Sequence, residues 1–116
     1  MKLFNYEEAP LREAEEGALG VKVRWLIASE TGAENFYMRL FEVSAGGWTP
    51  LHSHPWEHEI FVLEGNGIAQ GSSDEKAFGK GDVIFIPSGE LHQIRNSGSN
   101  SLKFLCLIPS ERLKKE

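Results

Sequence analysis

The sequence of 116 residues contains one cysteine, Cys106, so no disulfide can form within the chain. No apolar run approaches the ~20 residues that a membrane helix needs, and the first residues lack the hydrophobic stretch of a signal peptide. Basic residues are also few, because 12 Lys and Arg stand against 17 Asp and Glu, for a formal net charge of −5. Such a charge repels phosphate backbones and anionic bilayers. We therefore expect a cytoplasmic protein that binds neither nucleic acid nor membranes and acts on a small molecule, if it has a substrate.

The length suits a single globular domain. Residues 1–20 are rich in glutamate and read as an acidic lead-in, with room for a short helix over residues 11–16 between Pro10 and Gly17. Over residues 21–116, short runs of β-branched and aromatic residues alternate with turns rich in Gly, Pro, Asn and Ser, which predicts strands joined by hairpins. The expected strands cover residues 21–28, 36–43, 58–63, 67–70, 83–86, 92–95 and 102–108. This spacing indicates an all-β sandwich or barrel.

The four histidines are the clearest candidate site residues. His52, His54 and His58 lie close together, and His92 lies in a later expected strand. Alternate residues of a strand share a face, so His52 and His54 point together, and His58 joins them if the segment at Pro55 keeps the phase. If an adjacent strand delivers His92, four imidazoles meet at one point, and neutral imidazole is the commonest protein ligand for transition metals. The pattern predicts a site for one metal ion.

Two motifs frame these histidines. The first reads G-x5-H-x-H-x3-H-x6-G from Gly46 to Gly65, and the second reads G-x5-P-x-G-x2-H-x3-N from Gly81 to Asn96. Together they resemble the two motifs of the cupin superfamily. This resemblance implies a single-domain, antiparallel jelly-roll β-barrel, in agreement with the strands predicted over residues 21–116. One residue type departs from the usual motif, because His58 stands where the family has its acidic ligand.

Two glutamates, Glu57 and Glu59, flank His58 and could replace it as a ligand. Strand alternation turns both toward the opposite face unless a bulge shifts the phase, so we expect His58 to be the fourth ligand. The resulting set of His52, His54, His58 and His92 resembles a four-histidine subgroup of small single-domain cupins. That resemblance implies one divalent transition metal, with manganese first and Fe, Ni, Cu or Zn as alternatives.

The resemblance and strand alternation also indicate a pocket beside the metal. Residues that share a strand face with the ligands should line it, and the resemblance adds an earlier and a later strand. The predicted wall consists of Phe41, Ile60, Ile94 and Phe104. The candidate catalytic residues are Arg39 and Cys106. Arg39 is either a solvated strand residue or the group that binds a carboxylate bidentately, and Cys106 is either a small buried hydrophobe or a thiolate that the cation activates.

Four neutral imidazoles leave a divalent cation its full +2 charge, which favours an anionic guest and polarises a bound carbonyl or enolate strongly. The expected function is that of a metal-dependent dioxygenase or another oxidoreductase acting on a small molecule. Two alternatives stay open, namely a metal-dependent isomerase, decarboxylase or lyase, and a non-enzymatic module that binds a metal or a small ligand. The resemblance further implies a homodimer that associates through its sheets.

Overall fold

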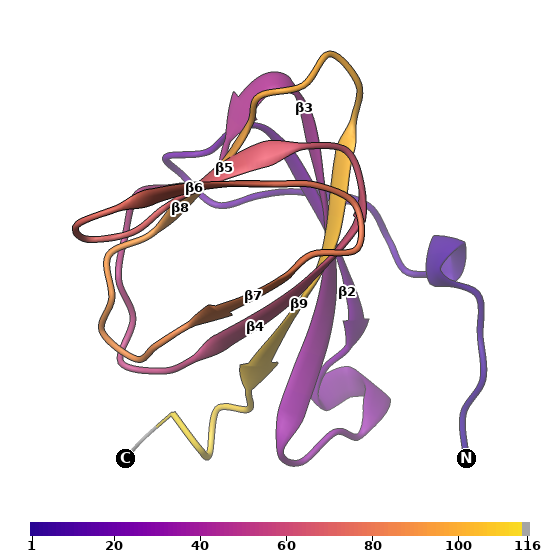
Figure 1. Cartoon of the computed structure of the whole chain (residues 1–116). Helices are drawn as coiled ribbons and strands as arrows, with labels where there is room; N and C mark the ends of the chain where they lie inside the picture. Colours follow the sequence, from indigo (N-terminus) through magenta and orange to yellow (C-terminus); the bar gives the residue numbers. More distant parts are fainter. Residues whose placement is uncertain (115–116) are drawn as a thin grey trace.

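The structure is a computed structural model that describes residues 1–114, nearly all of them in strands and connecting loops (Figure 1). The strands are β1 (Arg12–Glu13), β2 (Leu19–Ile27), β3 (Phe36–Trp48), β4 (His58–Glu64), β5 (Gly67–Gln70), β6 (Glu75–Phe78), β7 (Val83–Ile86), β8 (Gln93–Asn96) and β9 (Leu102–Pro109). Two 3-10 turns, η1 (Tyr6–Glu8) and η2 (Ser29–Thr31), complete the elements. None of the helical turns within residues 1–114 is long and apolar enough to cross a membrane.

The strands form one antiparallel sheet in the order β6-β5-β8-β3-β9-β4-β7, and β2 pairs with the edge of β3 opposite β9 and with β1. The sheet curls so that β5, β6 and β8 form one wall, and β4 and β7 form the facing wall (Figure 1). The long strands β2, β3 and β9 cross between the two walls. This arrangement confirms the predicted all-β, antiparallel jelly-roll barrel.

The bend in β3 joins the two parts of the barrel. Up to Val43 this strand pairs with β2 and β9, whereas its last residue, Trp48, pairs with Arg95 of β8. The change of direction occurs at Gly46, which has a φ of +78°, and at Gly47. A Cβ atom on Gly47 would lie 2.4 Å from the carbonyl oxygen of Leu19, so only glycine fits there without a shift of the backbone.

The core lies between the two walls and follows strict strand alternation. On β9 the buried side chains are Leu102, Phe104, Cys106 and Ile108, and on β4 they are His58, Ile60 and Val62. Glu57 and Glu59 are exposed, so the chain keeps the phase that places His58 inside. The ligand-bearing face of the sheet is therefore also the face of the hydrophobic core.

Three sequence predictions differ from the structure. The helix considered for residues 11–16 is wrong, because Arg12 and Glu13 form β1 and pair with Val23 and Lys22 of β2. Strand β6 was not predicted, since it is a short edge strand whose first three residues are exposed and therefore lack an apolar alternation. The third strand runs past residue 43 to Trp48, because its glycine bend carries it onto β8.

Candidate metal centre

Backbone pairing brings the four histidines together from separate segments. His52 and His92 form an isolated antiparallel bridge, in which each backbone N–H donates to the other residue's carbonyl oxygen, at 3.1 and 2.9 Å. The amide of Gly89 donates to the carbonyl oxygen of His54 at 2.7 Å. This hydrogen bond joins the loop before His92 to the loop before His58. His58 follows as the first residue of β4. The two motifs that lie far apart in sequence are thus joined by main-chain hydrogen bonds at the site itself.

The four imidazole rings are neighbours, and three of them bring their candidate ligand atoms together. Candidate ligand atoms of His52, His54 and His92 all lie within 4.8 Å of one another. The His58 ring centroid lies 4.9 Å from that of His92 and 5.3 Å from that of His54. His58 and His92 are buried, and the other two rings are partly exposed. Three histidines thus form a compact group of candidate ligands, and the fourth, His58, lies beside them.

Three of the four rings have their Nδ1 atom facing a neighbouring group of the protein. Nδ1 of His92 lies 2.8 Å from the carbonyl oxygen of Glu90, and Nδ1 of His58 lies 3.4 Å from Sγ of Cys106. Nδ1 of His52 lies 3.7 Å from a carboxylate oxygen of Glu15, which is a looser contact. A group that accepts a proton from Nδ1 fixes the tautomer in which Nε2 carries the free lone pair. These contacts favour Nε2 as the ligand atom.

Burial favours the neutral form of three of the imidazoles. It lowers the pKa of His54 to about 4 and that of His58 to about 3, with the charges of neighbouring groups as smaller causes. The pKa of His52 is also lowered, first by burial and then by His92. Neutral imidazole is the form that binds a metal.

The donor set fits a divalent transition metal. Nε2 of His58 is buried and has no hydrogen-bond partner, although a buried polar atom without a partner costs about 1–3 kcal/mol. A cation bound among the four rings would satisfy this atom. Four nitrogen ligands suit several ions, including Mn, Fe, Ni, Cu and Zn, so the chemistry of the donor set does not select one of them.

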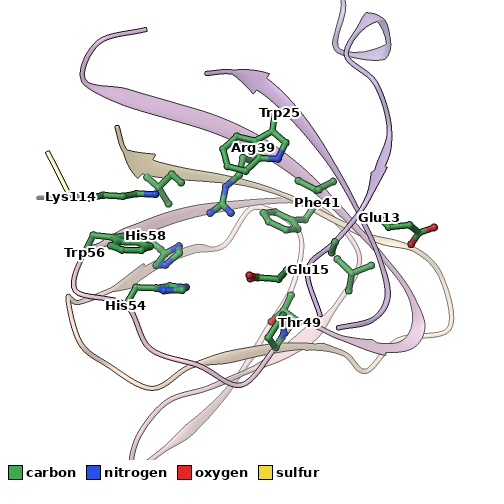
Figure 2. Close-up of a pocket in the computed structure, with 15 residues that line it drawn as sticks. Glu13, Glu15, Trp25, Arg39, Phe41, Thr49, His54, Trp56, His58 and Lys114 are labelled. Carbon is green, nitrogen blue, oxygen red and sulfur yellow. The ribbon is translucent and has the colours of Figure 1, made fainter. Parts of the chain in front are cut away.

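A pocket of about 420 Å³ opens beside the histidines (Figure 2). His54 and His58 lie in its wall, and a smaller cavity of about 50 Å³ continues inward to His52 and His92. The larger volume suits a small organic molecule. The residues that line one or both spaces and were predicted from sequence are Arg39, Phe41, Ile60, Ile94, Phe104 and Cys106.

Arg39 and Cys106 lie on paired positions of β3 and β9 and contact each other directly. Nη2 of Arg39 donates to Sγ of Cys106 at 3.2 Å, and the same sulfur faces His58. Burial raises the pKa of the Cys106 thiol, although Arg39 opposes that shift. A buried thiol that pairs with two side chains is better suited to hold them in place than to act as a nucleophile.

Several pocket residues were not predicted from the sequence. Glu15 reaches into the pocket from the N-terminal segment, Lys114 enters from the segment after β9, and Trp25 lies on β2 (Figure 2). Trp25 shares its strand face with Val21 and Val23, so alternation could have indicated it. No alternation pattern indicates that Glu15 or Lys114 lines the pocket, because neither residue lies in a strand.

Comparisons with known proteins agree with the fold. A family model described as "Cupin domain" matches residues 39–108. Among solved structures, a polyketide cyclase from Streptomyces resistomycificus is 37% identical, with a TM-score of 0.87, over 94% of this chain and 79% of that chain. The matched residues 39–108 hold all four histidines.

Two curated relatives are similar over shorter stretches. A 1-methylthio-D-xylulose 5-phosphate methylsulfurylase of Rhodospirillum rubrum is 35% identical over 66% of this chain and 49% of its own length. An oxalate-binding protein of Thermotoga maritima is 38% identical over 60% of this chain and 61% of its own length. The matches thus span about half of the first relative and three fifths of the second.

Proposed function

Because the chain belongs to the cupin domain family, we propose that it is a metal-dependent enzyme acting on a small carbonyl or enol compound. In this proposal His52, His54, His58 and His92 hold one divalent cation, and the substrate lies in the adjoining pocket. The observation that carries the proposal is the buried, unpartnered Nε2 of His58, whose ring lies beside a group of three further imidazoles that line the same inner cavity.

A divalent cation with four neutral ligands keeps its +2 charge and acts as a Lewis acid toward a carbonyl or enolate oxygen. The protein's own residues supply the surroundings. Phe41 stacks on Phe104 at 5.2 Å, and with Ile60 and Ile94 these rings keep the inner cavity apolar and exclude water. Cys106 holds His58 and Arg39 in fixed orientations, and Arg39 offers guanidinium donors to a polar group of the substrate.

The similarity to a polyketide cyclase favours carbonyl chemistry over oxygen chemistry. Ring closure of a polyketide joins an enol carbon to a carbonyl carbon and then loses water. This reaction consumes no oxidant. The pocket offers aromatic walls from Trp25, Phe41 and Trp56 that suit a flat, conjugated molecule. The dioxygenase expected from the sequence would use the same histidines. The histidines therefore do not distinguish the two reaction classes, and an experiment is needed to separate them.

Metal analysis of protein purified without an affinity tag tests the first part of the proposal. We expect close to one equivalent of a divalent transition metal, which chelation removes. Ring closure of aryl poly-β-ketones, followed by mass spectrometry as loss of water, tests the second part under aerobic and anaerobic conditions. Equal turnover without oxygen supports the proposal, and turnover that requires oxygen uptake supports the dioxygenase instead.

Binding without turnover is the second candidate, favoured by the similarity to an oxalate-binding protein. A +2 centre beside Arg39 suits a small dicarboxylate. In that case the metal-loaded protein binds oxalate, measured by calorimetry, and converts none of the carbonyl substrates. A homodimer, expected from the family resemblance, is tested by light scattering of the same sample, in which the 13.0 kDa mass of one chain would contradict it.

A further inference from the structure

Two positively charged side chains enter the pocket at the same end. Arg39 comes from β3 and Lys114 from the segment after β9, and Figure 2 shows both beside Trp56 and His58. The Lys114 side chain is only 15% exposed, and Glu111, at 4.0 Å from its Nζ, is 75% exposed and lies outside the pocket lining. Arg39 donates to a sulfur rather than to a carboxylate, and its Nε is buried without a partner. Of the described residues that line the pocket, none forms an ion pair with either cation.

Aromatic rings hold both cations in place. The Arg39 guanidinium lies 4.9 Å from the Phe41 ring centroid and 5.3 Å from that of Trp25. Nζ of Lys114 lies 4.2 Å above Trp56, whose indole in turn stacks on His54 at 4.5 Å with an interplanar angle of 5°. Cation–π contacts orient a charge without neutralising it. The pocket thus presents two oriented positive charges next to flat apolar surfaces.

The acidic residues of the pocket lie away from these cations. Figure 2 shows Glu13 at the opposite end, and Glu15 reaches toward the centre, where it contacts His52. Burial lowers the pKa of Lys114; Glu111 opposes this shift and Arg39 adds to it. Among residues 1–114, the acidic residues that line the pocket are Glu13 and Glu15, and neither forms an ion pair with Arg39 or Lys114. The two cations therefore repel each other until an anion enters.

We propose that the substrate is a flat, conjugated anion whose negative group binds between Arg39 and Lys114 and whose ring system packs against Trp25. This proposal rests on the proposed function, because it takes the same pocket as the substrate site. It adds a substrate class, namely aryl carboxylates or acidic enols of similar shape, and it assigns anion recognition to Lys114. The carbonyl of such a molecule would lie toward the histidines, and the anion would lie at the outer end.

Benzoate is the probe, with benzamide as its neutral analogue and acetate as the anion without a ring. Binding is measured by tryptophan fluorescence and calorimetry, on protein as purified and after chelation. We expect benzoate to bind about tenfold more tightly than either analogue, because it alone has both features and one charge-assisted hydrogen bond is worth about a factor of ten. Equal binding of benzoate and benzamide would overturn the proposal.

Lys114→Met removes the charge and keeps the chain length, and we expect it to weaken benzoate binding about tenfold. Lys80→Met is the matched control, since Lys80 is exposed, does not line this pocket and changes the net charge equally. Lys114→Arg should retain most of the affinity. A thermal unfolding curve for each variant shows whether it is folded, and unchanged benzoate binding in folded Lys114→Met overturns the proposal.

Chelation separates this proposal from the proposed function. If the cations bind the anion, the effect of Lys114→Met persists in chelated protein, although the absolute affinity can fall. If only the metal binds the carboxylate, chelation abolishes binding and Lys114→Met changes nothing, which overturns this proposal and leaves the metal site intact. If the purified protein holds no metal but still shows the effect of Lys114→Met, the anion site stands and the metal-dependent function fails.

Discussion

The histidine cluster and the mouth of the pocket are built in different ways. The cluster rests on segments joined by backbone hydrogen bonds, such as the His52–His92 bridge, and two of its four rings are buried. The mouth, by which we mean the part of the pocket wall formed by Glu15 and Lys114, comes from segments outside the barrel strands, near the two ends of the chain. The fold therefore holds the histidine cluster rigidly, whereas Glu15 and Lys114 can change without disturbing the barrel.

Removing one histidine of the cluster should give the largest loss of metal affinity among the variants proposed below. We expect His92→Ala to lower the affinity for divalent metal more than about 100-fold, because loss of a ligand exceeds the 10- to 100-fold effect of losing an outer partner. Metal competition with a chromophoric chelator measures the change. Leu91→Ala is the control, since Leu91 is the neighbouring residue, is exposed and does not line the pocket. Unchanged affinity in His92→Ala would place the metal elsewhere.

Cys106→Val tests whether the cluster also depends on its buried outer partner. Valine has a similar volume but accepts no hydrogen bond, so Nδ1 of His58 loses the contact at 3.4 Å. We expect metal affinity to fall about tenfold, at the lower end of the range for outer partners. Cys106→Ser keeps an acceptor and should lose less. Equal losses in the two variants would mean that packing, and not the contact with His58, accounts for the effect.

The histidine cluster could be predicted from the sequence because its residues lie in two short motifs with fixed spacing. The spacing of His52, His54 and His58 predicts one strand face, although the structure places His52 and His54 in the connection between β3 and β4. The two motifs predict that His92 joins them. The structure groups candidate ligand atoms of His52, His54 and His92, places the His58 ring beside them, and leaves Glu57 and Glu59 exposed. The barrel followed from alternation and turn residues in the same way, apart from β6, an edge strand that buries little.

The mouth was less accessible because its residues depend on tertiary placement. Glu15 lies in an acidic segment that looks fully solvated in sequence, but the turn at Gly17 packs against Pro50 and carries it over the pocket. Lys114 lies beyond the last strand, where no periodicity indicates a direction. Charged residues outside regular elements carry no pattern that relates them to a pocket.

Glu15→Gln should give the smallest loss of metal affinity, and it measures how strongly a residue of the mouth affects metal binding. The carboxylate lies 3.7 Å from Nδ1 of His52 and its side chain is 63% exposed, so we expect metal affinity to fall only about two- to threefold, as for an exposed charge contact. Glu13→Gln is the matched control, because Glu13 lines the same pocket from the same segment at its far end. The same chelator competition measures both variants. A loss in Glu15→Gln as large as that in Cys106→Val would contradict the comparison, because the N-terminal segment would then belong to the structure that holds the metal.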